Sequence, residues 1–442
     1  MRTEVAGTSL LLAGIVLLAA TLSVSAVLAP EVGAAGGDGS VARQTLVGSQ
    51  GGGAGWHKYG SVYLLTGNNT TWREDSADSY FDVTRRDDGT VVAAFMHSGY
   101  QDCGPYEPPC TRTGYRVIDT APQPHVVDEY SYPVRTAKNS EAHDAEPLPS
   151  GEMLLTDMEH ERIMTVKDGE ITWQWRASDF YEAPPDPTKT DWLHINDVDH
   201  IGGDRYLVSV RNANQLLIVE RGRGVVEVIN EDDDASDATC TGSGQLRDRD
   251  GDGEVRCGDP SLLNHQHNPQ WLGDGAVLVA DSDNDRIVEL HRNETGEWVI
   301  AWTLDSAEEV DFNWPRDADR LANGNTLVTD TLNRRLVEVN ESGAVNWSVR
   351  TDRVPYEADR LPEGESSPGR LYHPEIGSGT ASQQDSASTG DDVPGLSLAL
   401  VGLRAVYPSL PFWYGELQLA LTLLSLVLVA AGVRFRWVAA RE

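Results

Sequence analysis

The sequence predicts an all-β fold, a six-bladed β-propeller flanked by an N-terminal and a C-terminal hydrophobic helix. Three observations lead to this prediction: a strand-and-turn unit recurs, six copies of it can be counted, and an uncharged stretch lies near each end. Repeats of roughly 40–50 residues that hold several short strands are typical of propeller blades, because one such unit cannot bury both of its faces alone. The recurrence therefore predicts one blade for each copy.

The recurrent unit consists of a polar entry, a Gly turn, a buried strand that ends in Asp, a polar turn and a second strand. Its clearest copy lies between Leu263 and Leu290, and a Gly turn with a Trp-bearing third strand often follows. The last copy breaks down after Gly364, so we expect residues 58–67 to supply its missing strands and close the ring. The four strong copies begin at His143, Asn196, His267 and Arg316, and the two weak copies begin at Phe81 and Tyr356.

The N-terminal segments precede the propeller. Residues 1–32 include an uncharged stretch that is long enough to span a bilayer and ends in small residues. This pattern suits either a signal peptide or a transmembrane anchor, and the sequence leaves both open. Residues 33–55 read as a flexible Gly-rich linker, and residues 56–375 as the propeller domain.

The C-terminal segments are predicted to return the chain to a membrane. Residues 376–394 are low in complexity and are expected to be disordered, and residues 395–411 form a possible interfacial helix. Residues 412–434 are predicted to be a transmembrane helix, with a cytoplasmic tail at 435–442. Because Arg434, Arg436 and Arg441 follow the apolar stretch, the positive-inside rule places the propeller outside the cell membrane.

The formal net charge of −34 limits the classes of partner. An acidic surface spread along the chain argues against nucleic acid and against anionic lipid for the globular part. Adaptation to high salt is the favoured interpretation, since a carboxylate-rich surface stays hydrated there. A surface that binds a cationic partner is the alternative.

The four cysteines form two close pairs, Cys103/Cys110 and Cys240/Cys257. Pairs of this kind in loops predict two small disulfide-closed loops in an oxidising compartment. Neither pair has the ligand spacing of a zinc site. The sequons at Asn68, Asn69, Asn293, Asn340 and Asn346 also fit an outside location.

The candidate site comes from superposing the repeats on one another. The residue before the recurrent carboxylate or amide sits, in a propeller, at one mouth of the central channel. Several of these residues or their neighbours are basic, which predicts a local site for sulfate or phosphate in an acidic protein. Ordinary turn residues and a zinc site on three imidazoles are the alternatives. The basic set is His143, His194, His267, Arg211 and Arg316, with His265 beside it.

The recurrent carboxylates themselves are expected to be structural, since Asp in a tight connection caps backbone amides. They are Asp82, Asp144, Asp197 and Asp317.

A separate pattern, from Asp248 to Asp259, resembles a calcium-binding loop of the EF-hand type. Asp248, Asp250, Asp252 and Asp259 occupy ligand positions, and Asp stands in place of the usual Glu at the last one. A structural calcium ion that braces the Cys240/Cys257 insertion is therefore one interpretation, and a chance run of Asp and Gly is the other.

Several catalytic motifs are missing from the sequence. It holds no Gly-rich phosphate loop of the GxxxxGK type, no GxSxG turn and no HExxH pair. Nucleotide-dependent transfer and serine-hydrolase chemistry are therefore not supported.

The repeat domain resembles the arylsulfate-type aryl sulfotransferase family. The resemblance rests on HDAEPLPSG at His143, on HIND at His194 followed by SVR ending at Arg211, and on QHNP at Gln266. It implies a six-bladed propeller that moves a sulfuryl group from a phenolic sulfate ester to a phenol, without a catalytic cofactor. It further implies that His267 is the nucleophile that becomes sulfohistidine. Binding of the sulfuryl oxygens is assigned by the same resemblance to His143, His194, Asn196 and Arg211, and we expect Arg316 and His265 to bind substrate.

Two functions remain open on the sequence. One is a transferase that uses an aryl sulfate and a phenol as its small-molecule partners. The other is a non-catalytic, membrane-tethered propeller that binds an anionic ligand or a cell-surface partner. The combination of HxN, Arg211 and the QH pair favours the transferase.

Overall fold

The computed structural model describes residues 2–30, 32–33, 43–52, 56–138, 140–231, 246–249, 251, 255–273, 275–364, 369–373, 394–407 and 410–440. The chain divides into two compact units. One unit is Val32–Ser382, and the other combines Met1–Glu31 with Gln383–Glu442.

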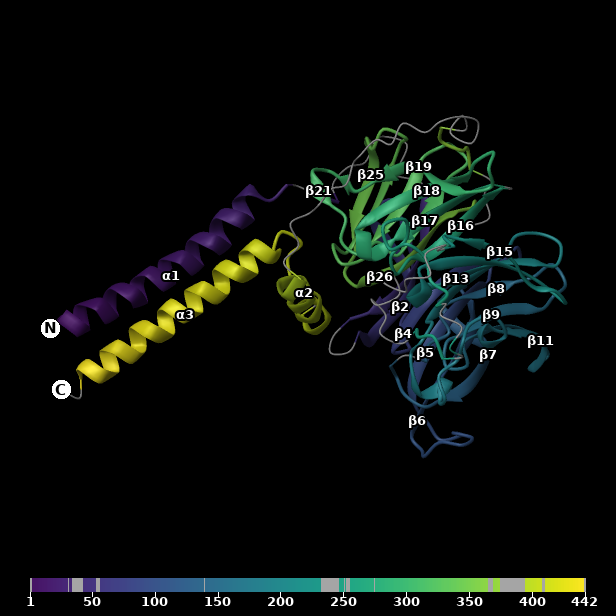
Figure 1. Cartoon of the computed structure of the whole chain (residues 1–442), viewed down its shortest axis with the longest axis horizontal. Coiled ribbons are helices and arrows are strands. Elements are labelled where there is room, and N and C mark those ends of the chain that lie inside the picture. Colours follow the sequence, from purple (N-terminus) through teal and green to yellow (C-terminus); the bar gives the residue numbers. More distant parts are fainter. Residues whose placement is uncertain are drawn as a thin grey trace. The chain divides into compact units, whose positions relative to one another are not determined.

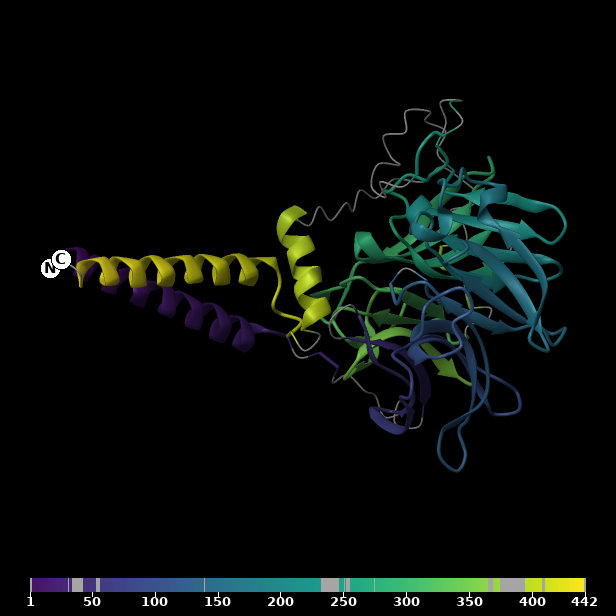
Figure 2. The ribbon, with the colours of Figure 1, turned by 90° about the horizontal axis from the view of Figure 1, so that it is seen from below.

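The larger unit is a six-bladed β-propeller, as predicted (Figure 1, Figure 2). Each blade is a sheet of four antiparallel strands, and a two-stranded ribbon, β20 (Ser306–Ala307) with β21 (Val310–Asp311), lies between the fifth and sixth blades in the chain. The second blade consists of β4 (Ser79–Arg85), β5 (Val91–Tyr100), β6 (Cys110–Asp119) and β7 (His125–Val134); the third of β8 (Ala145–Pro147), β9 (Met153–Asp157), β10 (Arg162–Lys167) and β11 (Glu170–Arg176); the fourth of β12 (Ile195–His200), β13 (Arg205–Val210), β14 (Gln215–Glu220) and β15 (Gly224–Ile229); the fifth of β16 (His267–Gly273), β17 (Ala276–Asp281), β18 (Arg286–Arg292) and β19 (Trp298–Leu304); the sixth of β22 (Asp317–Arg320), β23 (Thr326–Asp330), β24 (Arg335–Val339) and β25 (Val345–Arg350).

The first blade closes the ring with strands from both ends of the unit. Its order is β26 (Val354–Leu361), β1 (Gln44–Gly51), β2 (His57–Thr66) and β3 (Asn69–Glu74). Residues 58–67 do complete the last repeat, as expected, but they are joined to it through β1. The predicted linker at 33–55 is therefore wrong over 44–51. The Gly and Ser residues of this strand made it resemble a linker in the sequence. At Gly48 the residue type has a structural reason, because the backbone lies so close to Phe81 that only glycine fits there.

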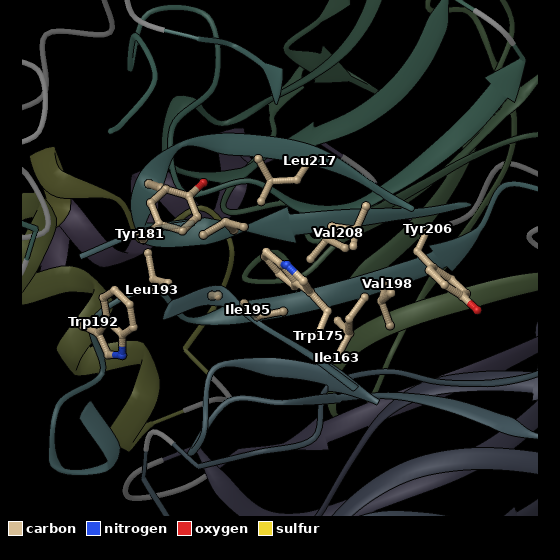
Figure 3. Packing of buried hydrophobic residues seen from close by; sticks show 14 of the residues in the cluster. Ile163, Trp175, Tyr181, Trp192, Leu193, Ile195, Val198, Tyr206, Val208 and Leu217 are labelled. Carbon is tan, nitrogen blue, oxygen red and sulfur yellow. The ribbon is translucent and has the colours of Figure 1, made fainter. Parts of the chain in front are cut away.

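The hydrophobic core lies between neighbouring blades. Figure 3 shows one such layer, in which Trp175 and Ile163 of the third blade meet Ile195 and Val208 of the fourth. These side chains are at most 6% exposed. Because consecutive side chains of a strand point to opposite faces, alternate residues of each inner strand fill the layers on its two sides.

Three of the four recurrent carboxylates connect their blade to a neighbouring one. Asp82 accepts a hydrogen bond from the backbone N–H of Ala145 at 3.2 Å, and Asp144 accepts one from that of Val198 at 2.7 Å. Asp317 does the same with Ala358 at 3.0 Å. These aspartates are structural, as expected, but they bind amides of the neighbouring blade and not of their own turns. Their recurrence therefore reflects the packing of blade on blade.

The two cysteine insertions are only partly described. Cys103 and Cys110 form the predicted disulfide, with a Cα–Cα distance of 5.7 Å. Cys257 is disulfide-bonded, whereas its predicted partner Cys240 lies outside the described residues. Asp250 and Asp252 of the calcium-type loop also lie outside them. Within the described part of that loop, Asp248 accepts the N–H of Gly251 and Asp259 accepts that of Ser261.

The smaller unit holds three helices. Helices α1 (Arg2–Leu28) and α3 (Glu416–Ala439) lie side by side, and α2 (Pro394–Val406) precedes α3. The long helices are apolar and long enough to cross a membrane, by length and composition. A Cβ atom on Gly432 would lie 2.6 Å from the backbone nitrogen of Leu11, so their close approach requires glycine there. Helices thus occupy most of the predicted ranges 395–411 and 412–434, with α3 extending to Ala439.

Candidate functional site

The beginnings of the inner strands bring aromatic and basic side chains together. The rings of His143 and Tyr356 are stacked with centroids 5.5 Å apart, and Phe81 meets both rings edge-on. The ring of His267 lies 6.1 Å from that of Tyr356, and the ring of His194 lies 5.3 Å from that of His143. Residues from blades one to five of the ring therefore converge, as the superposed repeats predicted. We call His143, His194, His267, Arg211, Arg316 and Tyr356 the inner-strand cluster.

Three consecutive blades enter the cluster through the same strained backbone conformation. His194, His265 and Trp314 have φ values of 56°, 48° and 52°, in the left-handed region. Each stands two residues before the position that the repeats align. Non-glycine residues in this region are uncommon and cost about 1–3 kcal/mol each, so their recurrence marks a constrained entry to the inner strand.

The hydrogen bonds of His267 determine which ring nitrogen carries the proton. The Nδ1 atom lies 3.1 Å from the carbonyl oxygen of His265 and 2.8 Å from the hydroxyl of Ser282. Ser282 donates its own hydrogen to the carbonyl of Pro315 at 2.6 Å, so both neighbours of Nδ1 act as acceptors. Nδ1 is therefore the protonated nitrogen, and Nε2 of the neutral ring keeps its lone pair.

The surroundings of His267 keep the imidazole neutral. Its side chain is buried, and burial lowers its pKa well below the ordinary value, with a further decrease from the charges of Arg316 and Arg211. A neutral imidazole with a free Nε2 lone pair is a nucleophile.

His143 lies at the centre of the aromatic contacts and is also held neutral. Burial lowers its pKa well below the ordinary value. Its Nδ1 atom is buried and has no hydrogen-bond partner within the described part of the chain. An unpaired buried nitrogen costs free energy, so a ligand that offers it a partner is favoured.

His194 differs from the other two histidines because a carboxylate binds its ring. Its Nδ1 atom lies 3.0 and 2.9 Å from the two carboxylate oxygens of Asp191. Glu161 holds the same loop through the backbone N–H groups of Leu193, His194 and Ile195. Figure 3 shows Trp192, Leu193 and Ile195 in the core layer; both residues next to His194 are fully buried, whereas the His194 side chain is 16% exposed.

Two arginines give the cluster its positive charge. Arg316 is buried, lies over the rings of Trp314 at 4.3 Å and Tyr356 at 5.0 Å, and donates to the side chain of Gln50. Burial lowers its pKa to about 10, so it stays charged near neutral pH. Arg211 donates to Asn212 at 2.8 Å. Among the described residues neither guanidinium has a carboxylate partner, which is unusual for a buried cation such as Arg316; Arg211 is partly exposed.

Two of the predicted residues occupy supporting positions. Asn196 is fully buried, and its side-chain amide donates to the carbonyl of Gln266 at 2.9 Å, next to His267. It therefore holds the segment that carries His267. The ring of His265 is bound to Asp283 at 2.5 Å, and the indole N–H of Trp314 donates to the same carboxylate at 2.9 Å.

The structure adds residues that the repeats did not indicate. His57 lies 3.0 Å from Glu141 and 3.1 Å from Ser79, whose hydroxyl donates to Gln50. Burial alone would raise the pKa of Glu141, but the hydrogen bond and charge of His57 hold it below the ordinary value. His57, Ser282 and Asp191 lie outside the aligned positions. Only Asp191, three residues before His194, carried a local signal in the sequence.

Within the described ranges, no group of three or more His, Cys, Asp or Glu side chains has the geometry of a metal site. The three imidazoles of the cluster instead differ in their partners: His143 has an unpaired nitrogen, His194 a carboxylate and His267 a hydroxyl. Together with two guanidinium groups that have no carboxylate partner among the described residues, they have the chemistry to hold an anion beside a nucleophilic nitrogen.

No protein-family model matches the chain, and no curated protein matches its sequence. Solved structures with a similar fold include a protein of unknown function from Bacteroides caccae, at 14% identity and a TM-score of 0.47, covering 73% of this chain and 100% of that one. The periplasmic gluconolactonase PpgL of Pseudomonas aeruginosa is 12% identical, with a TM-score of 0.40 and coverage of 72% and 98%. Virginiamycin B lyase from Staphylococcus aureus is 11% identical, with a TM-score of 0.37 and coverage of 63% and 73%.

Proposed function

We propose that this protein is an aryl sulfotransferase that moves a sulfuryl group from a phenolic sulfate ester to a phenol through sulfohistidine at His267. The observation that carries the proposal is the pair of acceptors at Nδ1 of His267, the carbonyl of His265 and the hydroxyl of Ser282. They leave the lone pair on Nε2 of a neutral ring, which is the form that attacks sulfur.

The surroundings of that nitrogen suit a sulfate monoester. One negative charge on the sulfuryl oxygens is matched by Arg211 and Arg316, which lower the pKa of His267 through their charge and have no carboxylate partner among the described residues. His143 offers the unpaired nitrogen. The partly exposed ring of Trp314 offers an aromatic surface for the aryl group beside these donors, and the buried rings of Phe81 and Tyr356 pack against the histidines. Donors fixed on separate blades are preorganised for the charge that develops on the oxygens.

The covalent mechanism requires two half-reactions. In the first, Nε2 of His267 bonds to sulfur while the sulfur–oxygen bond to the donor phenol breaks. In the second, the acceptor oxygen bonds to sulfur and the electron pair of the N–S bond returns to Nε2. The donor phenol therefore leaves before the acceptor reacts, and no nucleotide is consumed.

The proposal extends to location. The disulfide Cys103–Cys110 fits an oxidising compartment, and the two apolar helices fit a membrane attachment. We propose that the propeller faces the outside, because arginines follow the apolar part of α3. High external salt is the condition that we expect for the enzyme.

The test is turnover of p-nitrophenyl sulfate at molar salt, with and without an added phenol, by the full chain in detergent. Wild-type protein should release p-nitrophenol faster when phenol is added, and rapid quenching should trap one SO₃ group on a peptide that contains His267. His267→Asn should fold normally and show neither result. The full chain binding aryl sulfate without any turnover would instead favour a non-catalytic anion-binding propeller.

A further inference from the structure

The three histidines of the inner-strand cluster have different hydrogen-bond partners, and only one is bound to a carboxylate. The Nδ1 atom of His194 contacts both oxygens of Asp191, at 2.9 and 3.0 Å. Asp191 stays ionised: burial opposes this, but the charge of His194 and the hydrogen bond to its ring hold the carboxyl pKa below the ordinary value. A carboxylate on Nδ1 both orients an imidazole and stabilises its protonated form.

The other ring nitrogen of His194 is available. Within the described residues its Nε2 atom has no hydrogen-bond partner, and the ring is stacked on His143 at 5.3 Å with an interplanar angle of 24°. The left-handed backbone of His194 and the hydrogen bonds that the loop's three backbone N–H groups donate to Glu161 fix the position of the ring. Such a rigidly held Asp–His pair is the arrangement of a general acid–base group.

We infer that His194 is the catalytic acid–base of the sulfuryl transfer and that Asp191 is its positioning residue. This inference rests on the proposed function and departs from the family resemblance, in which His194 binds sulfuryl oxygens. It also assigns a role to a carboxylate that lies outside every motif of the resemblance. The sulfuryl oxygens are then bound by Arg211, Arg316 and His143.

The proton balance of both half-reactions follows from this assignment. His194 begins as the imidazolium, with Nδ1–H donated to Asp191 and a second proton on Nε2. As His267 bonds to sulfur and the ester bond breaks, the electron pair goes to the phenolic oxygen, which takes the Nε2 proton. In the second half-reaction neutral His194 takes the proton of the acceptor phenol, whose oxygen bonds to sulfur. His267 recovers its lone pair, and His194 is again protonated.

General acid catalysis matters most for a strongly basic leaving group, because p-nitrophenolate departs readily without a proton and phenolate does not. The experiment is therefore the first half-reaction of the full-length protein, measured by rapid quenching with p-nitrophenyl sulfate and with phenyl sulfate. For Asp191→Asn and for His194→Gln we expect a loss of about 100-fold or more with phenyl sulfate, the usual contribution of such a group. With p-nitrophenyl sulfate we expect a loss below about tenfold. The double variant should be no worse than His194→Gln alone, since the two residues act as a unit.

His160→Gln is the matched control. His160 also bonds through Nδ1 to an aspartate three residues before it, at 2.9 Å from Asp157, but its ring belongs to the loop after β9 and is 34% exposed. This variant should keep the wild-type rates with both esters. An equal loss with both esters in Asp191→Asn and His194→Gln would overturn the inference while leaving the sulfotransferase intact. No turnover of either ester by the wild-type protein would contradict the proposed function itself.

Discussion

The Nδ1 atom of His267 lies 2.8 Å from the hydroxyl oxygen of Ser282, and that hydroxyl is already committed as a donor to Pro315. The serine therefore accepts from the histidine, and the proton of the imidazole is held on the side away from the cluster. Ser282, in the loop after β17, thus determines which ring nitrogen of His267 in the neighbouring strand β16 can react. The repeat gave no indication of Ser282, because it follows the Asp that ends the buried strand.

Replacing Ser282 by alanine tests this relationship. The Nδ1 proton of His267 keeps only the longer bond to the His265 carbonyl, so the reactive tautomer is less strongly favoured. We expect kcat/KM for p-nitrophenyl sulfate to fall by about tenfold, which corresponds to one hydrogen bond of about 1.4 kcal/mol. Ser342→Ala, in an exposed turn, is the control and should have the wild-type rate. A Ser282→Ala enzyme with an unchanged rate would contradict the assigned role of the serine.

The disulfide between Cys103 and Cys110 closes a loop with a sequence separation of seven residues. Cross-linking a loop this short should stabilise the fold by about 2 kcal/mol through the unfolded state. We expect the double variant Cys103→Ser/Cys110→Ser to unfold at a lower temperature but to keep its propeller, since the disulfide closes only the connection between β5 and the first residue of β6. Mass spectrometry of unreduced peptides checks the bond directly. Free thiols at both positions in protein isolated from cells would contradict an oxidising location.

The pH dependence of stability should reflect the carboxylates that connect the blades. Burial raises the pKa of Asp82 and of Asp317 to about 7, from an ordinary value of 3.8. At these two carboxyls the folded protein binds more protons than the unfolded chain between about pH 4 and pH 7, so their contribution to the free energy of unfolding decreases as the pH rises through this range. Carboxyls with a lowered pKa, such as Asp191, act below about pH 4. The lowered pKa values of His143 and His267 act in the opposite direction below about pH 6.5, because there the unfolded chain binds their protons and the folded protein does not.

Each such proton contributes a slope of up to about 1.4 kcal/mol per pH unit. We therefore expect Asp317→Asn to flatten the decrease between pH 4 and pH 7, because the amide keeps an acceptor for Ala358 and has no proton to lose. Denaturant unfolding at constant high salt measures this. Asp88→Asn, in the exposed turn before β5, should leave the slope unchanged. An Asp317→Asn protein with the same slope as the wild type would contradict proton uptake by Asp317 on folding.

The sequence predicted the architecture because the strand-and-turn pattern of a propeller blade recurs along the chain and can be counted. Aligning six copies was sufficient to bring Phe81, His143, His267, Arg316 and Tyr356 into one place, since equivalent positions must meet around an axis. What the repeats could not show was the partner of each side chain. Ser282 follows β17, Asp191 precedes β12 and His57 begins β2, so all three lie outside the aligned positions. Only folding brings Ser282 and His57 beside the aligned residues.

The segment that the sequence misassigned is also explained by packing. Residues 44–51 hold Gly48 and Gly51 and lack a clear apolar alternation, so they read as a linker. These residues form β1 because β26 and β2 pair with them on both sides. The two neighbouring strands thus stabilise an extended segment whose own β propensity is weak. Tertiary context there overrides the local preference of the chain.

Arg316 allows a test of whether a buried residue serves activity or stability. It is a buried guanidinium that has no carboxylate partner among the described residues, so it costs free energy that a structural residue would recover through an ion pair. Arg335 of the same blade shows the contrast: it is equally buried and bonded to Asp330 at 2.6 Å. If Arg316 is there to bind sulfuryl oxygens, its loss should harm activity without harming the fold.

We therefore expect Arg316→Met to unfold at the same temperature as the wild type or a higher one, and to lose about 100-fold in kcat/KM for p-nitrophenyl sulfate. Arg335→Met should lower the free energy of unfolding by about 3–5 kcal/mol, because it leaves Asp330 buried without its partner. Thermal unfolding and steady-state kinetics of the two variants, measured at one salt concentration, make the comparison. An Arg316→Met protein that was destabilised as strongly as Arg335→Met, with activity lost only in proportion to the folded fraction, would make Arg316 a structural residue and remove it from the anion site.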